Sequence, residues 1–137
     1  MRVARVLGLW FGLACVPPLR PSVEFVYPIP PSFATDQGAL QAAICAGQEH
    51  LAPKRSYASL RFYLVRGMTF DLQGHWSPGH DYAYSGYTIG GAVYVAEGRK
   101  DLVAIWAHEF LHAIYGLPGK TAESHPPTFA RCGLDTI

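Results

Sequence analysis

Apolar and polar positions alternate with two different periods along this chain, and each period predicts a different kind of element. In the segment 35–52, apolar residues recur at helical spacing, which is typical of an amphipathic helix. The apolar positions of this pattern are Leu40, Ala43, Ile44 and Gly47. Thr35 or Asp36 is suited to cap the start of the helix, and Pro53 is expected to end it.

Three further segments have the composition of strands. The first reads SVEFVY (residues 22–27), and the prolines at 28, 30 and 31 are expected to end regular structure after it. The second, YASLRFYLVRG, presents Leu60, Phe62 and Leu64 on one face. The third, YTIGGAVYVAEG (residues 87–98), is rich in β-branched and aromatic residues. Its Gly90–Gly91 pair predicts a bulge or a close backbone approach within that strand.

A second helix is expected from Leu102 to about Tyr115, with Asp101 as its N-cap. Gly116 is suited to end it in a left-handed conformation, and Pro118 cannot continue it. Its residues are apolar on nearly every side, which is typical of a buried helix. The pattern therefore predicts an α+β fold. A small mixed sheet would pack on the early helix and on this central helix.

Length and charge narrow the class of protein. The chain has 137 residues, which is the size of one domain, and a net charge of +1 gives no support for nucleic-acid binding.

Two arginines and an uncharged run ending in Gly-Leu-Ala make residues 1–14 resemble a signal peptide, so the protein is expected to be exported. Residues 15–34 are expected to be a proline-rich linker containing the first strand, and 35–137 the functional domain. The alternative for the N-terminal run is a buried strand or helix.

The cysteines support the same export hypothesis. If Cys15 is removed with the signal, or carries a lipid at a mature N-terminus, two cysteines remain. Cys45 and Cys132 are then expected to pair in an oxidising compartment. The alternatives are two buried free thiols and, for Cys15, anchoring of the protein to a membrane.

The central helix contains the sequence HEFLH. On a helix, His112 lies about 40° around the axis from His108, and Glu109 lies about 100° from it. Two imidazoles one turn apart can bind the same metal ion, and zinc suits imidazole ligands. Glu109 is offset, so it is better placed to act on a metal-bound water than to bind the metal. The alternative is two core histidines hydrogen-bonded to their neighbours.

HEFLH also resembles the His-Glu-x-x-His signature of the zincin metallopeptidases, and the order of strand 87–98 and helix 102–115 is similar. The resemblance implies that strand 87–98 lies at the sheet edge beside a cleft, and that residues 35–137 form a zincin-like catalytic domain. This resemblance implies that His108 and His112 are zinc ligands and that Glu109 is the catalytic base. The longer HExxHxxGxxH pattern is not followed, because Tyr115 replaces its glycine and Pro118 its last histidine.

A catalytic zinc ion usually has a third protein ligand. His125 is the preferred candidate, because the connection before it is long enough to fold back over the metal. The other candidates are Glu123, Asp135 and Cys132.

Three functions remain open from the sequence. The preferred one is a zinc-dependent hydrolase that cleaves a peptide or protein substrate, with Glu109 as general base. The second is a non-catalytic protein that a metal stabilises and that serves a structural or partner-binding role. The third is a lipoprotein anchored through Cys15 whose main role is to bind a partner.

Overall fold

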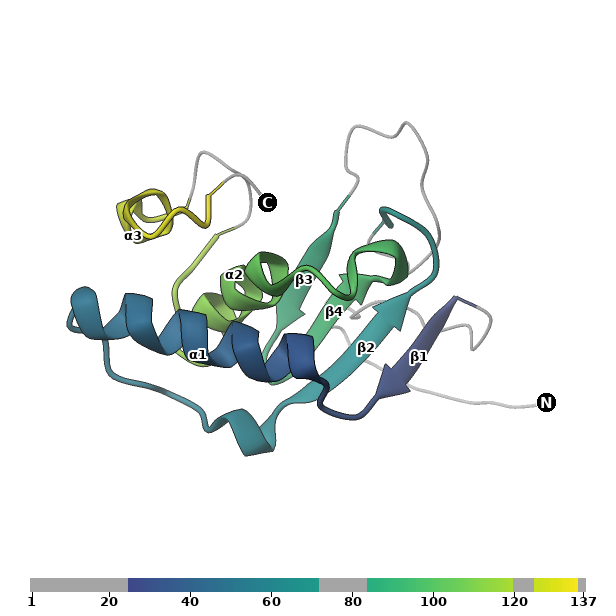
Figure 1. The fold of residues 1–137 in the computed structure, drawn as a ribbon, viewed down its shortest axis with the longest axis horizontal. Helices are drawn as coiled ribbons and strands as arrows, with labels where there is room; N and C mark the ends of the chain where they lie inside the picture. Colours follow the sequence, from purple (N-terminus) through teal and green to yellow (C-terminus); the bar gives the residue numbers. More distant parts are fainter. Residues whose placement is uncertain (1–24, 72–83, 120–124, 136–137) are drawn as a thin grey trace, which may run out of the picture.

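The computed structural model describes residues 25–71, 84–119 and 125–135. Within them the chain forms a four-stranded mixed sheet with the strand order β1-β2-β4-β3, and helices that pack on it (Figure 1). The strands are β1 (Val26–Ile29), β2 (Arg61–Val65), β3 (Gly86–Ile89) and β4 (Ala92–Ala96). The α+β class expected from the sequence is confirmed.

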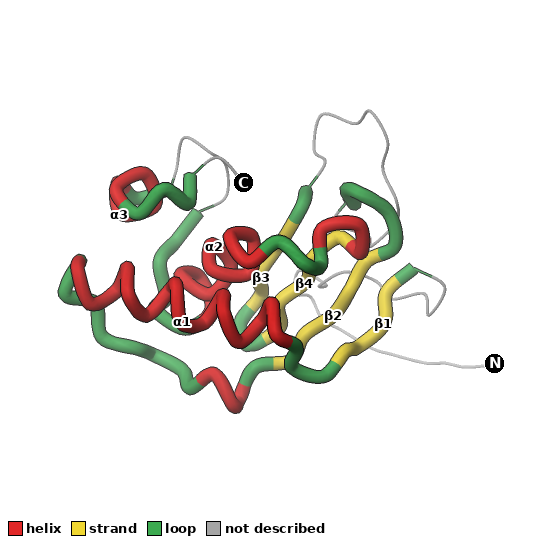
Figure 2. Tube along the Cα trace, in the orientation of Figure 1, coloured by secondary structure: helices red, strands yellow, loops and turns green. Residues whose placement is uncertain are grey.

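Two of the three α-helices cover one face of the sheet. The helices are α1 (Phe33–Gln48), α2 (Val103–Ala113) and α3 (Pro127–Arg131), with short 3₁₀ helices η1 (Tyr57–Ser59) and η2 (Glu97–Arg99). Helix α2 packs on β3 and β4, and α1 packs along α2. Figure 2 shows α3 apart from the sheet, above one end of α1 in this view. None of the helices in the described part of the chain has the length and apolar character needed to cross a bilayer.

Strand β1 lies at one edge of the sheet and pairs antiparallel with β2. The expectation that Pro28 ends regular structure is wrong, because Pro28 lies inside β1 and is paired with Tyr63. An edge strand tolerates proline, since the missing N–H can fall on the unpaired side. The first strand thus lies within residues 15–34, where one was expected, but it begins at Val26 and continues past Pro28 to Ile29.

The segment around Gly90 and Gly91 is a hairpin turn and not a bulge within one strand. Gly90 has a φ of +57°, which glycine adopts readily, and Ile89 pairs with Ala92 across the turn. The chain thus reverses, so that β4 lies inside the sheet parallel to β2 and β3 becomes the free edge.

Helix α1 starts and faces differently from the sequence expectation. Ser32 is its N-cap, in a capping box with Thr35, and the helix ends at Gln48, before Pro53. Leu40 and Ile44, expected in the core, are 54% and 55% exposed. The buried face instead consists of Ala34, Thr35, Gly38, Ala42, Cys45 and Ala46.

Close packing of the two long helices explains that reversal. A Cβ atom added at Gly38 would lie 2.5 Å from the Cβ of Trp106, so the helices approach more closely than large side chains allow. The face of α1 that contacts α2 must therefore carry small residues, and the larger apolar residues point outward.

The N-terminus of α2 lacks the expected cap. Leu102 is the N-cap residue, and no side-chain hydrogen bond caps the helix, so the assignment to Asp101 is wrong. Helix η2 leads into α2, and the Trp106 indole N–H donates to the Lys100 carbonyl at 2.8 Å. At the other end Gly116 has a φ of +70°, and its N–H donates to the His112 carbonyl, as expected for a glycine that ends a helix.

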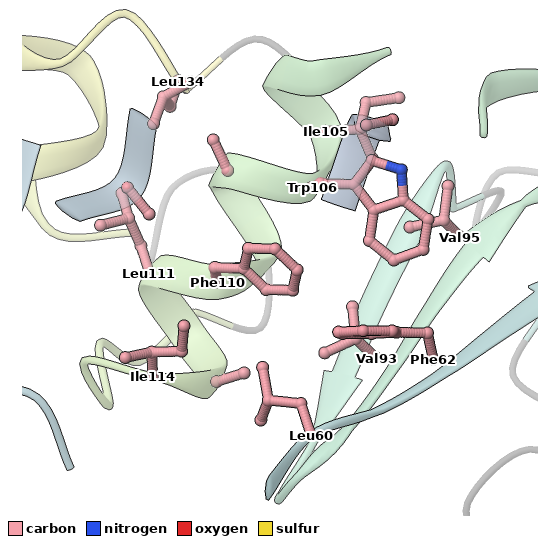
Figure 3. Close-up of a cluster of buried hydrophobic side chains, with 14 of the residues drawn as sticks. Leu60, Phe62, Val93, Val95, Ile105, Trp106, Phe110, Leu111, Ile114 and Leu134 are labelled. Atoms are coloured by element: carbon pink, nitrogen blue, oxygen red, sulfur yellow. The ribbon is translucent and has the colours of Figure 1, made fainter. Parts of the chain in front are cut away.

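The main core lies between α2, α1 and the sheet. Figure 3 shows Trp106 and Phe110 pointing from α2 toward Phe62, Val93 and Val95 of the sheet. The Trp106 and Phe110 side chains are fully buried, and the Phe62 and Trp106 rings meet edge to face with centroids 5.7 Å apart. Burial of these rings fixes the rotation of α2, and so determines which side its histidines face.

The C-terminal segment is covalently tied to α1. Cys45 and Cys132 form a disulfide across 87 residues of chain, as expected from the sequence, and Cys15 lies outside the described residues. The Arg131 guanidinium also donates to both Glu49 carboxylate oxygens at the end of α1. These links hold α3 near the C-terminal end of α1.

Candidate metal centre

Three imidazoles meet on the side of α2 that faces away from the sheet. His108 and His112 come from consecutive turns of α2, and His125 comes from the segment that precedes α3. Their candidate ligand atoms all lie within 4.8 Å of one another. The structure thus brings together the three histidines that the sequence predicts as zinc ligands.

Backbone carbonyls orient the two imidazoles of α2. His108 Nδ1 lies 2.5 Å from the Leu134 carbonyl oxygen, and His112 Nδ1 lies 2.6 Å from the Leu117 carbonyl oxygen. A carbonyl oxygen only accepts, so each Nδ1 must carry the hydrogen and each Nε2 keeps its lone pair. Histidines that bind metals are commonly held in this way through their second nitrogen.

The spacing between the ligand atoms suits a tetrahedral ion. His112 Nε2 and His125 Nε2 are 3.2 Å apart. Two Zn–N bonds at a tetrahedral angle would place the two nitrogens about 3.4 Å apart. The donor set therefore fits a zinc ion without a large rearrangement of these two rings.

Gly119 provides space beside the same rings. A Cβ atom added there would lie 2.7 Å from His125 Nε2 and 2.8 Å from His112 Cε1. Its φ is not in the left-handed region, so the requirement is for space and not for an unusual backbone conformation. No pattern in the sequence indicated this role, because it depends on where the connection after α2 crosses the histidines.

Burial keeps the α2 imidazoles in the form that binds metals. It lowers the pKa of His108 to about 4, although the hydrogen bond to the Leu134 carbonyl opposes the shift. Burial likewise lowers the pKa of His112, against the opposing effect of the Leu117 carbonyl. Both rings are thus neutral near pH 7, and metal binding need not displace a proton from either Nε2.

Glu109 lies beside the three histidines. Its carboxyl group is buried, with Oε1 accepting a hydrogen bond from the Thr88 hydroxyl at 2.7 Å and Oε2 4.0 Å from His108 Nε2. Burial raises the pKa of Glu109 to about 8, and the Thr88 hydrogen bond partly offsets that rise. The group of candidate ligands consists of the histidines alone, which agrees with the offset expected for Glu109 on the helix.

Phe129 covers the histidines from α3. Its fully buried ring has centroid distances of 4.7 Å to His108, 4.9 Å to His112 and 4.7 Å to His125. The sequence did not reveal this contact, because nothing in the residues of α3 indicates that Phe129 packs against α2. An apolar cover of this kind limits the access of water to one side of the cluster.

Of the other candidates for a third ligand, the two that the structure describes are not in the group of candidate ligands. Cys132 is in the disulfide, so it has no thiolate to offer. Asp135 is exposed and is not part of the group of candidate ligands, although its charge acts on the pKa of His108. Glu123 lies outside the described residues.

Comparisons with protein-family models, with curated proteins and with solved structures found no match to this chain. The function is therefore inferred from the geometry of the centre and from its motif.

Proposed function

We propose that this protein is a zinc-dependent hydrolase, and most specifically a peptidase. The observation that carries the proposal is the convergence of His108, His112 and His125 beside the buried carboxyl group of Glu109. Three imidazole ligands with an adjacent carboxylate are typical of catalytic zinc sites, whereas structural sites are usually closed by four protein ligands.

The chemistry follows from the donor set. A zinc ion on three imidazoles supplies a Lewis acid that polarises a carbonyl group and lowers the pKa of water toward 7. The contribution of the chain is to hold the Nε2 atoms in place and to provide Glu109 as general base. Oε2 takes a proton from the attacking water and returns it to the leaving nitrogen. A cation bound by the neighbouring histidines would lower the pKa of Glu109 from the value raised by burial, toward the neutral range in which a carboxyl group both takes up and releases a proton.

A peptide substrate is supported by the resemblance of HEFLH to zincins and by the position of β3. The strand Gly86–Ile89 is the sheet edge next to α2, and an extended peptide can pair with such an edge. Gly90 and Gly91 form the turn at the end of this strand, so the pairing is proposed along Gly86–Ile89.

A metal-stabilised protein without catalytic activity is the second candidate. It is favoured by the contact of Phe129 with all three histidines and by the disulfide that fixes α3, since both features also suit a purely structural site.

We also propose that the protein is exported, either as a soluble protein or anchored to a membrane by a lipid on Cys15. Residues 1–24 lie outside the described part of the chain, and the disulfide is compatible with an oxidising compartment.

Metal content tests the centre itself. The purified protein is expected to bind one zinc ion per chain, and His108→Ala and His112→Ala each to lose most of it. His50→Asn is the matched control, because His50 is exposed, lies outside the group of ligands and has a φ of 56° that asparagine tolerates. Elemental analysis together with far-UV circular dichroism separates metal loss from unfolding. Full zinc occupancy in both alanine variants would contradict the proposal.

Peptide cleavage tests catalysis. The wild-type protein and Glu109→Gln, both loaded with equal zinc, are incubated with a diverse peptide mixture, and products are identified by mass spectrometry. Only the wild-type protein is expected to cleave, because glutamine cannot take up the proton; loss of a general base typically costs about 10²–10⁴-fold in rate. Equal rates would exclude Glu109 as the base. Zinc binding without cleavage by either protein would favour the second candidate.

A further inference from the structure

The edge strand β3 contacts the Glu109 carboxyl group through two alternate residues. Gly86 and Thr88 pair with Val95 and Val93 of β4, whose side chains face the core around α2. Alternate residues of a strand point to the same face, so positions 86 and 88 both face α2. Each affects a different oxygen of the same carboxyl group.

Thr88 fixes one of these oxygens. Its hydroxyl oxygen lies 2.7 Å from Glu109 Oε1 and 3.3 Å from the Glu109 carbonyl oxygen. A hydroxyl has one hydrogen to donate, and the shorter contact to a carboxylate is the stronger bond. The bond stops rotation of the carboxyl group, which leaves Oε2 on the side of His108.

Gly86 makes room for the other oxygen. A Cβ atom added there would lie 2.8 Å from Glu109 Oε2 and 3.0 Å from its Cγ. The φ of Gly86 is not in the left-handed region, so the position requires a small residue and not a special backbone. Any side chain at position 86 would push the carboxyl group out of its present position.

We infer that Thr88 and Gly86 are positioning residues for Glu109: the hydroxyl anchors Oε1, and the missing side chain lets Oε2 lie toward the three histidines. Their effect on turnover rests on the proposed hydrolase function, while the anchoring itself does not. The edge strand thereby orients the base on the neighbouring helix. Neither residue carried a signal in the sequence, because the hairpin that brings β3 to α2 was not foreseen.

Paired substitutions test the anchoring in the zinc-loaded full chain. Thr88→Val keeps the shape and removes the hydroxyl, and it is expected to lower kcat about 10–100-fold with little change in KM, as for the loss of other outer hydrogen-bond partners. Thr88→Ser restores the hydroxyl and is expected to restore kcat. Zinc content should equal that of the wild-type protein in both variants. A fall in kcat that serine does not rescue would overturn the inference.

Gly86→Ala has a matched control in the same hairpin. The alanine is expected to displace Glu109 and lower kcat roughly tenfold or more, since small misplacements of a catalytic group are costly. Gly91→Ala should leave kcat unchanged, because a Cβ atom there meets nothing closer than 3.8 Å. Equal rates for Gly86→Ala and the wild-type protein would overturn the role of Gly86.

A measurement of stability, which does not depend on catalysis, tests the anchoring independently of the proposed function. Denaturant unfolding is measured for Thr88→Val, Glu109→Met and the double variant. Thr88→Val should lower the unfolding midpoint of the wild-type protein more than that of Glu109→Met, because the methionine side chain offers no oxygen and leaves only the 3.3 Å contact to the backbone carbonyl of residue 109. Additive effects would overturn the inference whether or not the protein cleaves peptides. Coupled effects in a protein without turnover would refute the hydrolase proposal and leave the anchoring intact.

Discussion

The two sides of α2 are held in different ways. Toward the sheet and α1, Trp106 and Phe110 pack against aromatic rings and branched side chains, and the one polar atom of this pair, the indole N–H, donates to the Lys100 carbonyl. On the opposite side, His108 donates to the Leu134 carbonyl of the C-terminal segment and His112 donates to the Leu117 carbonyl just after α2, with Phe129 packed above both rings.

The contrast shows that a polar site is held by directional hydrogen bonds, whereas an apolar core needs only complementary packing and buried apolar surface. Burial of an apolar side chain lowers the free energy wherever the side chain leaves water. Many arrangements of the side chains between α2 and the sheet would therefore be acceptable. Burial of an imidazole is favourable only when each ring nitrogen has a hydrogen-bond partner or a metal ion in the correct position. The cover over the histidines is therefore fixed by a disulfide, an ion pair and specific carbonyl groups.

The largest effect is expected on the packed side. Phe110→Ala removes a fully buried ring between α2 and β2, and large-to-small changes of this kind cost about 3–5 kcal/mol. Denaturant unfolding with and without added zinc measures the cost. Zinc should bind with the same stoichiometry if the folded state persists. A cost below about 1 kcal/mol would mean that this side is less tightly packed than the burial of Phe110 indicates.

A comparable but smaller loss is expected on the histidine side when its covalent link is removed. The double variant Cys45→Ala/Cys132→Ala should lose about 2–5 kcal/mol of stability, because the disulfide closes a loop of 87 residues. It should also weaken zinc binding, since Leu134 and Phe129 are no longer tied to α1. Competition with a fluorescent chelator measures the affinity. Unchanged zinc affinity would show that the cover is held in place without the link.

The smallest effects distinguish two glycines of α1. Gly38→Ala should destabilise by about 1–3 kcal/mol, because the new methyl group would overlap Trp106. Gly47→Ala, where a Cβ atom meets nothing within 4 Å, should instead stabilise by up to about 1 kcal/mol through helix propensity. Thermal unfolding of the two variants gives the comparison. Equal shifts would argue against the close approach of α1 and α2.

The sequence was most informative where the structure is local. The His108 and His112 pair follows from helical geometry, and the stop at Gly116 follows from its backbone freedom. His125 required only that the chain could return, which its length allows. Zinc binding and catalysis by Glu109 stay predictions from that motif.

The N-cap of α2, at Leu102 and not at Asp101, is a local miss, whereas most of the others depend on contacts that the local pattern does not contain. Leu40 and Ile44 fit a helical apolar face, but the close packing of α1 on α2 places small residues there instead. The Gly90–Gly91 pair predicts a bulge or a close backbone approach within one strand, and only the pairing of Ile89 with Ala92 shows that the chain turns there. Thr88, Gly119 and Phe129 contribute to the centre only because the fold brings their segments to α2.

The disulfide also has a consequence for the order in which the molecule matures. Residues 125–134 leave the ribosome after all four strands and α2, so the core can assemble while only His108 and His112 are present on the helix. On the proposed metal-binding function, an ion captured at that stage would have two protein ligands and would exchange readily. The third imidazole and the carbonyl of Leu134 are secured once Cys132 is oxidised. The compartment in which that oxidation occurs would then set which metal the protein retains.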